Sequence, residues 1–412
     1  MNKDQFGYYL VGNYKTYSKI DALEYAHLIN TPVKWVFNDD VFSTHPWHID
    51  PQIDLKKLYK KRAEQIRKKY DYIVIWYSGG VDSWTVTNSF SENNIHVDEI
   101  AQFHSYEGEK TWDTCLNKEV KDVAVPQSQE FLNVMPHTKH RTVDLTSVIK
   151  SIFNEENNRL DFVYKFNHSW GPHVLARNYV REKVADWRNI IASGKKLCFV
   201  WGSDKPPVRY DTINDKHYLE FMDIIDSSSV GPRIQMLNRS EDHDELFYWS
   251  PDAMDLITRQ AHIIVNYMRN PPKEDLDSIY LTSDPYTYLI SYDGEYLPVN
   301  RKRTATKINN KMYYLTERGL NRLIYSDWKQ DTFTVGKQVS TIFNIKDRWW
   351  FDAYKADAQN LFIGAMESYH KKFTKWGFNK FNNDKLTKMG HAQDFRHINI
   401  DTCYSKKYYL EI

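Results

Sequence analysis

Hydrophobic runs and amphipathic segments alternate along the central part of the chain. The apolar run Ile73–Trp76 is followed by two glycines and then by polar and apolar residues at helical spacing. Strand-like segments lie around Glu99–His104, around Arg141–Leu145 and in Leu197–Gly202, and helical spacing extends from Pro172 to about Ile191. Because strands that alternate with helices imply crossover connections, the pattern predicts an α/β fold. Its sheet is expected to be doubly wound and mainly parallel, with helices on both faces.

The segments on either side of this core have a different pattern. Near the N-terminus, a strand, a helix and a second strand precede an amphipathic helix that begins at Asp54. Farther along, a helix with Ser250 as its N-cap ends at Pro271, and Asp293-Gly294 between alternating segments indicates a β-hairpin. We therefore predict three parts: a small α+β lead-in at 1–65, the α/β domain at 66–270 and an α+β C-terminal region at 271–412.

The helix that begins at Asp54 has a run of lysines and arginines on its outer side. Leu55, Leu58, Ala63 and Ile66 share its apolar face. The cations are most simply a solvated face, with those near the helix C-terminus favoured by the helix dipole. Nucleic-acid binding by this run is the less favoured alternative.

Composition narrows the class of protein. The 412 residues are 41% hydrophobic, which is typical of a globular chain, and 55 basic residues balance 54 acidic ones. Such a balance gives no global charge to steer nucleic acid. Three widely spaced cysteines, Cys115, Cys198 and Cys403, argue against a disulfide framework and against zinc or iron–sulfur sites. With no apolar run typical of a signal peptide or a membrane span, we expect a cytoplasmic protein without membrane contact.

The turn after Ile73–Trp76 has the composition of an anion site. It reads Ser78-Gly79-Gly80-Val81-Asp82-Ser83 and leads directly into a helix. Glycines let backbone N–H groups converge on a ligand, and the helix N-terminus adds unpaired donors and partial positive charge. Asp82 would oppose an anion unless a cation such as Mg²⁺ lies between them. An ordinary strand-to-helix turn with Asp82 as a cap is the simpler alternative.

The SGGVDS sequence resembles the SGGxDS loop of the PP-loop ATP pyrophosphatases. This superfamily includes the synthetase domain of asparagine synthetase, tRNA-modifying enzymes and the reductases of adenylylated sulfate. The resemblance follows the order of elements from about Asp71 to Arg269, and its specific part is the loop. It implies the nucleotide-hydrolase type of α/β domain over 66–270, with ATP and Mg²⁺ as ligands.

The resemblance also implies roles for individual residues. Ser78, Gly79, Gly80, Val81 and Ser83 would hold the β- and γ-phosphates, and Asp82 would orient the magnesium ion. The strand that ends at Gln102-Phe103-His104 would lie against the adenine. This last expectation depends on the order of the elements alone.

A second candidate loop follows the strand Leu197–Gly202. Ser203, Asp204 and Lys205 should lie on the same sheet edge as the glycine turn, because parallel strands bring their carboxyl ends together. Lys205 and Arg209 are candidates to neutralise departing pyrophosphate, and Asp204 is a candidate cation ligand. A proline-stiffened turn with solvated charges is the alternative.

Several other polar residues are weaker candidates, for which packing or solvent exposure is at least as good an interpretation. They are His173, Arg177, Arg233, the His137/His140 pair, the Arg259/His262 pair and the basic cluster Arg301–Arg303.

The leading hypothesis is an ATP-dependent enzyme that forms AMP and pyrophosphate. It would adenylate a carbonyl or carboxyl oxygen of a small-molecule or RNA acceptor for attack by a nitrogen nucleophile. No cysteine follows Met1, so we expect no glutaminase domain in cis, and the nitrogen would come from ammonia, a substrate amine or a partner in trans. The alternatives are a reductase or sulfur-transfer enzyme that uses Cys403, and a nucleotide-binding protein without catalysis.

Overall fold

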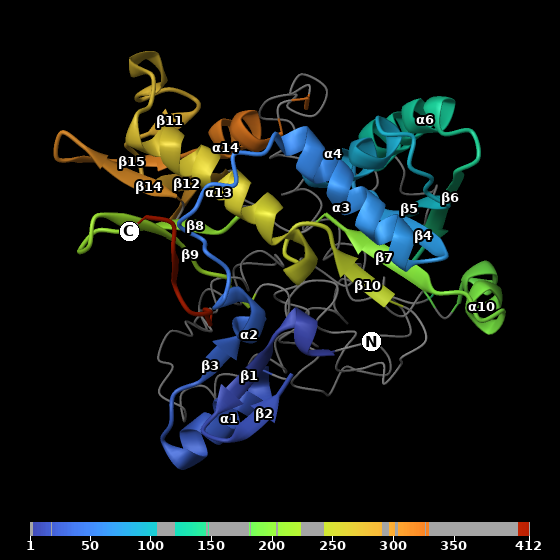
Figure 1. Ribbon diagram of the computed structural model, residues 1–412, viewed down its shortest axis with the longest axis horizontal. Coiled ribbons are helices and arrows are strands. Elements are labelled where there is room, and N and C mark those ends of the chain that lie inside the picture. The colour runs from blue at the N-terminus through green and yellow to red at the C-terminus, as the bar shows by residue number, and fades with distance from the viewer. Residues whose placement is uncertain are drawn as a thin grey trace.

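The centre of the molecule is a five-stranded sheet in which all strands are parallel. Its order is β10-β7-β4-β5-β6 (Figure 1). The strands are β4 (Tyr72–Trp76), β5 (Glu99–His104), β6 (Lys139–Asp144), β7 (Leu197–Trp201) and β10 (His243–Leu246). The computed structural model describes residues 3–17, 19–104, 120–145, 147, 181, 183–202, 205–223, 243–290, 296–300, 304–325, 327–328 and 403–411.

The strand order fixes where a ligand is expected. The chain runs from β4 through β5 to β6 on one side, and then returns to place β7 and β10 on the other side of β4. The order therefore reverses between β4 and β7, and in open α/β sheets ligands bind beyond the carboxyl ends of the strands at such a point. The predicted α/β class with a parallel sheet is confirmed, and the strand order is compatible with a Rossmann-like fold.

Helices cover both faces of this sheet. On one face α3 (Leu55–Lys69) packs against α4 (Val81–Ser91) and α13 (Met254–Arg269) (Figure 1). On the other face Trp187 of α10 (Ala185–Ala192) contacts Trp76 and Phe199, with ring centroids 5.7 and 5.0 Å apart. Among the described residues, a π-helical turn, Val120–Ala124, and α6 (Val125–Val134) also lie near the sheet.

Helix caps agree with the sequence, but one predicted helix, whose start at Pro172 lies outside the described residues, is interrupted at Val184. The Asp54 side chain accepts from the Lys56 backbone N–H at 2.9 Å, as an N-cap should. The helical spacing from Pro172 predicted one continuous helix, whereas α10 begins only at Ala185 and Val184 is extended. Just before this, Arg181 donates to Asp244 at 2.6 Å and lies over the Phe199 ring. Tertiary contacts, rather than helical spacing, fix the chain there.

The basic face of α3 is also not fully solvated, contrary to the sequence interpretation. Arg62 is buried and donates to Glu245 at 2.8 Å. Lys69 and Tyr70 contact the other oxygen of the same carboxylate. Here a charged residue within an apparently exposed run forms part of the interior because its partner comes from β10.

The described parts of both flanking segments contain strands and helices. The N-terminal part contains a three-stranded sheet, and the C-terminal part contains the predicted hairpin, whose Asp293-Gly294 turn lies outside the described residues. One hydrophobic core includes residues of both flanks and of the central sheet. The N-terminal elements are η1 (Lys3–Phe6), β1 (Tyr8–Val11), β2 (Tyr14–Thr16), α1 (Lys19–Ile29), β3 (Lys34–Val36) and α2 (Asp39–Phe42). The later ones are β8 (Val208–Asp211), β9 (Lys216–Leu219), η4 (Pro251–Ala253), η5 (Lys273–Asp275), β11 (Leu281–Thr282), β12 (Tyr286–Ile290), β13 (Tyr296–Asn300), β14 (Ala305–Ile308), β15 (Lys311–Leu315), α14 (Glu317–Ile324) and β16 (Tyr408–Tyr409).

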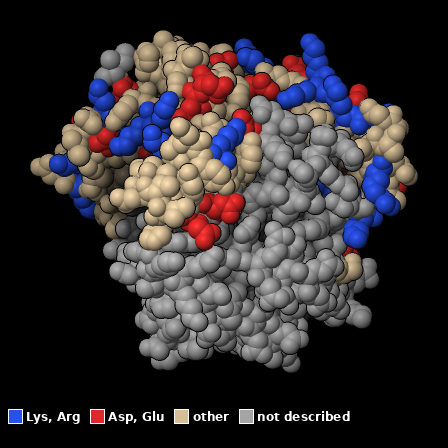
Figure 2. Space-filling view, turned by 90° about the horizontal axis from the view of Figure 1, so that it is seen from below, with Lys and Arg blue, Asp and Glu red and all other residues tan. Residues whose placement is uncertain are grey.

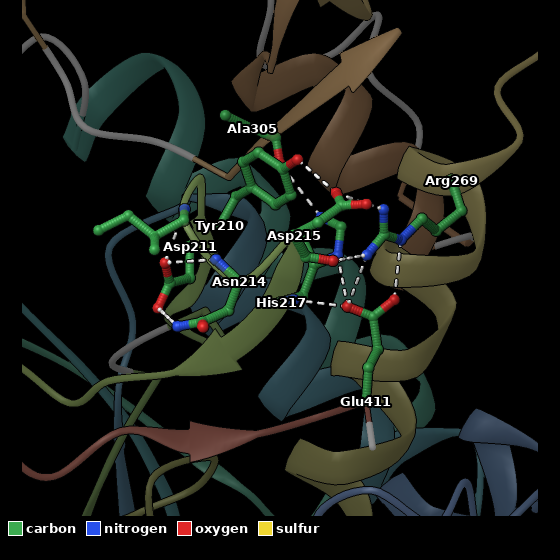
Figure 3. Close-up of polar contacts among 9 residues, drawn as sticks. Tyr210, Asp211, Asn214, Asp215, His217, Arg269, Ala305 and Glu411 are labelled. Carbon is green, nitrogen blue, oxygen red and sulfur yellow. Dashed lines mark hydrogen bonds and ion pairs between the residues drawn. The ribbon is translucent and has the colours of Figure 1, made fainter.

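Glu411 joins the last described segment to the body of the molecule. Its carboxylate accepts from Arg269 Nε at 2.8 Å and contacts His217 Nδ1 at 3.0 Å (Figure 3). The other ring nitrogen of His217 lies 3.1 Å from the Ala305 carbonyl oxygen. We call Glu411, His217 and Arg269 the C-terminal clasp. It connects β9, α13 and the start of β14 through buried or half-buried polar groups.

The described surface carries both signs of charge. On the face shown in Figure 2, basic and acidic side chains are interspersed among the described residues. Among those residues, no helix combines the length and apolar character that a bilayer crossing requires.

Candidate functional site

The glycine turn lies between β4 and α4, at the carboxyl edge of the central strand. Gly79 has φ of +80°, and a Cβ there would lie 3.1 Å from the backbone of Ala124. Gly80 is the N-cap of α4 with φ of −79°, and a Cβ there would lie 3.4 Å from Ser78 Oγ. The loop therefore needs glycine at Gly79 for its own backbone. At Gly80 a Cβ would make only an ordinary contact with Ser78 Oγ, so the backbone of the loop does not itself require glycine there.

Hydrogen bonds within the loop hold it in one shape. Ser83 Oγ donates to the Gly80 carbonyl at 3.0 Å and accepts from the Ser78 backbone N–H at 3.2 Å. Ser78 Oγ accepts from the Gly80 N–H at 3.3 Å. Ser78 is exposed, whereas Gly79 and Ser83 are buried. The first N–H groups of α4 lack intrahelical partners by geometry, so the turn presents donors suited to an anion.

The loop after β7 lies against this turn, as the sheet topology predicts. A Cβ on Gly202 would lie 3.0 Å from the Asp82 carbonyl carbon and the Ser83 nitrogen. Lys205 Nζ lies 2.8 Å from Asp82 Oδ2, and its backbone carbonyl accepts from Trp249 Nε1 at 3.1 Å. Ser203 and Asp204 lie outside the described residues, so the role predicted for Asp204 stays a prediction.

Asp82 is oriented by residues that the sequence did not single out. The Tyr325 hydroxyl donates to Asp82 Oδ1 at 2.7 Å, and the Tyr248 hydroxyl donates to the Asp82 carbonyl at 3.2 Å. Burial raises the pKa of Tyr325 well above its ordinary value, and the charge of Asp82 raises it further. Both oxygens of the Asp82 carboxylate are thus engaged, one by a permanent hydroxyl donor and one by an ammonium group.

A second carboxylate reaches Lys205 from the C-terminal part of the chain. Glu317, the first residue of α14, places Oε1 2.8 Å from Lys205 Nζ. Thr316 caps this helix, accepting from the Gly319 N–H at 3.1 Å. Local sequence carries no signal for Tyr325 or Glu317 as site residues, because neither belongs to a motif. Their proximity to the turn depends on the tertiary fold.

The β5 residues expected beside adenine have different surroundings. Gln102 is buried, and its amide nitrogen donates to the Ala124 carbonyl at 2.6 Å and to Ser128 Oγ. Phe103 is half-buried with its ring 6.0 Å from that of Trp76. The backbone of His104 ends β5, and its side chain is outside the description. Gln102 therefore holds the segment that supports Gly79, while adenine contact remains a prediction.

Arg209 lies on β8. Its guanidinium pairs with Glu220 at 3.3 Å and lies over the Tyr404 ring. Of the two cations predicted to neutralise pyrophosphate, Lys205 is the one that contacts the turn through Asp82.

Cys403 is half-buried, and its backbone N–H donates to Asp223 at 3.2 Å. Its proposed redox role stays a prediction.

The weaker candidates have structural partners or lie outside the description. Arg259 pairs with Asp50 and His262 contacts the Trp47 carbonyl, so this pair serves helix packing. His137 is exposed and His140 hydrogen bonds with Gln102. His173, Arg177, Arg233 and Arg301–Arg303 lie outside the described residues.

The turn fits a phosphate group better than it fits a free metal ion. Among the described residues, no group of three or more His, Cys, Asp or Glu side chains is arranged to hold a metal. Asp82 nevertheless already faces a cation, because its Oδ2 contacts the Lys205 ammonium. Mg²⁺ is usually bound by one or two carboxylates together with substrate phosphates. Asp82 therefore suits an ion that arrives with a polyphosphate.

We compared the chain with protein-family models and with characterised proteins, and neither comparison gave a match.

Proposed function

We propose that this protein binds ATP with Mg²⁺ at the SGGVDS turn and transfers its adenylyl group to an acceptor, releasing pyrophosphate. The domain would then be of the PP-loop ATP pyrophosphatase type. The acceptor would be a carbonyl or carboxyl oxygen of a small molecule or RNA, and a nitrogen nucleophile, supplied free or by a partner, would displace AMP.

One observation carries the proposal. Lys205, from the loop after the strand next to β4, contacts the carboxylate of Asp82 in the glycine turn at the point where the strand order reverses. This position combines backbone N–H donors, serine hydroxyl groups and the Lys205–Asp82 ion pair on one edge of the sheet. Such a combination supports polyphosphate binding, because the anion would be held by N–H groups and the cation by Asp82.

The proposed reaction needs positioning and charge neutralisation rather than a protein nucleophile. The acceptor oxygen forms a bond to the α-phosphorus, and the bond between that phosphorus and the bridging oxygen breaks, so pyrophosphate leaves with the electron pair. Ser78, Gly80 and Ser83 would hold the β- and γ-phosphates. Lys205 would offset the charge that builds on the leaving group, which is typically a large catalytic contribution.

Asp82 would hold the magnesium ion, which supplies further neutralisation of the phosphates. Tyr325 keeps the Asp82 carboxylate in one orientation through a hydrogen bond of 2.7 Å. The hydroxyl is held protonated by its raised pKa, so it remains a donor throughout the physiological range.

Nucleotide binding and chemistry are tested separately. Titration calorimetry with ATP in the presence of magnesium should give saturable binding by the wild type, and weaker binding by Asp82→Asn. Radiolabelled ATP incubated with pools of candidate acceptors and ammonia should then yield AMP and pyrophosphate in equal amounts. Absence of ATP binding at millimolar concentration would reject the proposal.

Asp255→Asn is a suitable control for removal of an acid. Asp255 forms an exposed pair with Lys61 at 2.9 Å. Its replacement should leave ATP affinity unchanged. Equal losses of affinity in Asp255→Asn and Asp82→Asn would show that the loss is not specific to the glycine turn.

A further inference from the structure

Lys205 lies between two carboxylates, one from the glycine turn and one from the C-terminal region. Its Nζ is 2.8 Å from Asp82 Oδ2 and 2.8 Å from Glu317 Oε1. The two acidic oxygens are therefore separated by no more than twice that distance. The Lys205 side chain is 15% exposed and that of Glu317 is 49% exposed, so Glu317 forms the outer side of the bridge.

The charges of this bridge are unfavourable for a bare polyphosphate. Among the described groups of this bridge, two carboxylates face one ammonium, so the bridge itself carries a net negative charge beside the turn that would bind phosphates. A polyphosphate without its metal would meet like charge, and it would compete with Glu317 for the Lys205 ammonium. A polyphosphate that carries Mg²⁺ brings compensating positive charge to the same place.

We infer that Glu317 is a specificity-determining residue that makes the site discriminate against metal-free polyphosphate. The inference rests on the proposed function, because it assigns a role at the same phosphate site. Glu317 acts on selectivity through charge and through its hold on Lys205. Asp82, which is turned inward and fixed by Tyr325, is the carboxylate suited to the metal ion.

The position of Glu317 supports a role that is separate from folding. It is the first residue of α14, where Thr316 already caps the helix, and its side chain is half exposed. Loss of its charge is expected to cost little stability, since exposed ion pairs contribute little. A change in ligand selectivity can therefore be measured in a folded protein.

The test compares pyrophosphate and ATP binding by calorimetry, with chelator and with magnesium, for the wild type and for Glu317→Gln. We expect Glu317→Gln to bind the metal-free ligands roughly threefold to tenfold more tightly, the size expected for removing one nearby solvent-facing charge. Affinity for the magnesium complexes should change less. The magnesium dependence of binding should thus shrink, and a gain of affinity cannot arise from partial unfolding.

Two further variants complete the design. Glu317→Asp keeps the charge and should retain more of the wild-type discrimination. Asp277→Asn removes an acid from the Lys311–Asp277 pair, which has the same 2.8 Å separation and an acid that is 48% exposed, and it should leave discrimination unchanged.

The outcomes separate this inference from the proposed function. A wild type that binds neither ligand under either condition rejects the proposed function. A wild type that binds them, with Glu317→Gln showing the same magnesium dependence, overturns the inference alone. Weaker binding of the magnesium complexes by Glu317→Gln also overturns it, because Glu317 would then be a metal ligand.

Discussion

The two adjacent glycines of the turn have different requirements at the residue scale. Gly79 has a left-handed backbone and lies against Ala124, whereas Gly80 has an ordinary φ and a Cβ there would make an ordinary contact with Ser78 Oγ. The backbone conformation thus requires glycine at position 79, whereas at position 80 the reason for glycine would be the proposed ligand. Asp82 also has two partners with separate roles, because Tyr325 orients its carboxylate and Lys205 neutralises its charge.

Alanine at each glycine should separate these needs. Gly79→Ala should lower the free energy of unfolding by about 2–4 kcal/mol, from left-handed strain and contact with Ala124. Gly80→Ala should change it by no more than about 0.5 kcal/mol while weakening ATP binding. Chemical denaturation and calorimetry measure the two effects. A large stability loss in Gly80→Ala would contradict this assignment.

Tyr325→Phe should remove the donor that orients Asp82. We expect a stability loss of about 1–2 kcal/mol and a several-fold loss of affinity for the magnesium complex of ATP. Tyr59→Phe is the matched control, because the buried Tyr59 hydroxyl donates to the Ile324 carbonyl at 2.6 Å. It should lose a similar stability with unchanged affinity. Equal affinity losses in both variants would show that the Tyr325 hydroxyl affects binding only through the stability of the fold.

At the scale of elements, β10 shows why part of the fold was not predictable. Its sequence, His243-Asp244-Glu245-Leu246, has little of the hydrophobic character expected of a buried strand. Asp244 pairs with Arg181 and Glu245 pairs with Arg62, so both charges are neutralised by side chains distant in sequence. By contrast β4, the turn and α4 follow one another directly. Their apolar run, glycines and helical spacing predicted them correctly.

The candidate site likewise contains some residues that the sequence predicted and others that it did not. The turn and Lys205 each follow a recognisable strand, so parallel topology predicted that they meet at one edge. Tyr325 and Glu317 follow no such rule, because α14 reaches the edge through packing in the C-terminal part. Arg62 belonged to a run that was predicted to be solvated, since sequence alone does not reveal a partner on β10.

Arg62→Met should strongly lower the free energy of unfolding. Burying Glu245 with only Lys69 and Tyr70 left as partners should cost about 3 kcal/mol, as expected when one member of a buried pair is removed. Lys60→Met is the control on the same helix, because Lys60 forms an exposed pair with Glu64. It should cost less than about 1 kcal/mol. Urea denaturation compares the two, and similar values would show that the Arg62 pair contributes no more than a surface pair.

At the scale of the whole molecule, the C-terminal clasp joins segments that lie far apart in the sequence. Burial acts to raise the pKa of Glu411, but the hydrogen bond from Arg269 and the contacts with His217 outweigh it, and the pKa is lowered. Burial lowers the pKa of His217 despite the nearby carboxylate. The clasp therefore favours an ionised Glu411 and a neutral His217.

Acid should release the clasp before the rest of the fold. Because the folded-state pKa of Glu411 is depressed, its contribution is present above its ordinary value of about 4.3 and is lost as pH falls through the lower folded value. Protonation of His217, disfavoured in the folded state, adds a loss that begins below about pH 6.5. Hydrogen exchange should show residues 403–411 losing protection in acid before β4 does. Glu411→Gln should be less protected already at neutral pH, and simultaneous loss in both regions would contradict the prediction.

The contact between Tyr325 and Asp82 also has a consequence for biosynthesis. The two residues are 243 positions apart, so the turn leaves the ribosome long before its orienting tyrosine exists. At typical elongation rates of 5–20 residues per second, the delay is roughly 12–50 s. During that interval, a nascent chain has the glycine turn but lacks Tyr325, which orients Asp82, and Glu317, which contacts Lys205. Nucleotide selectivity would therefore be acquired late, only after α14 has been translated and has docked.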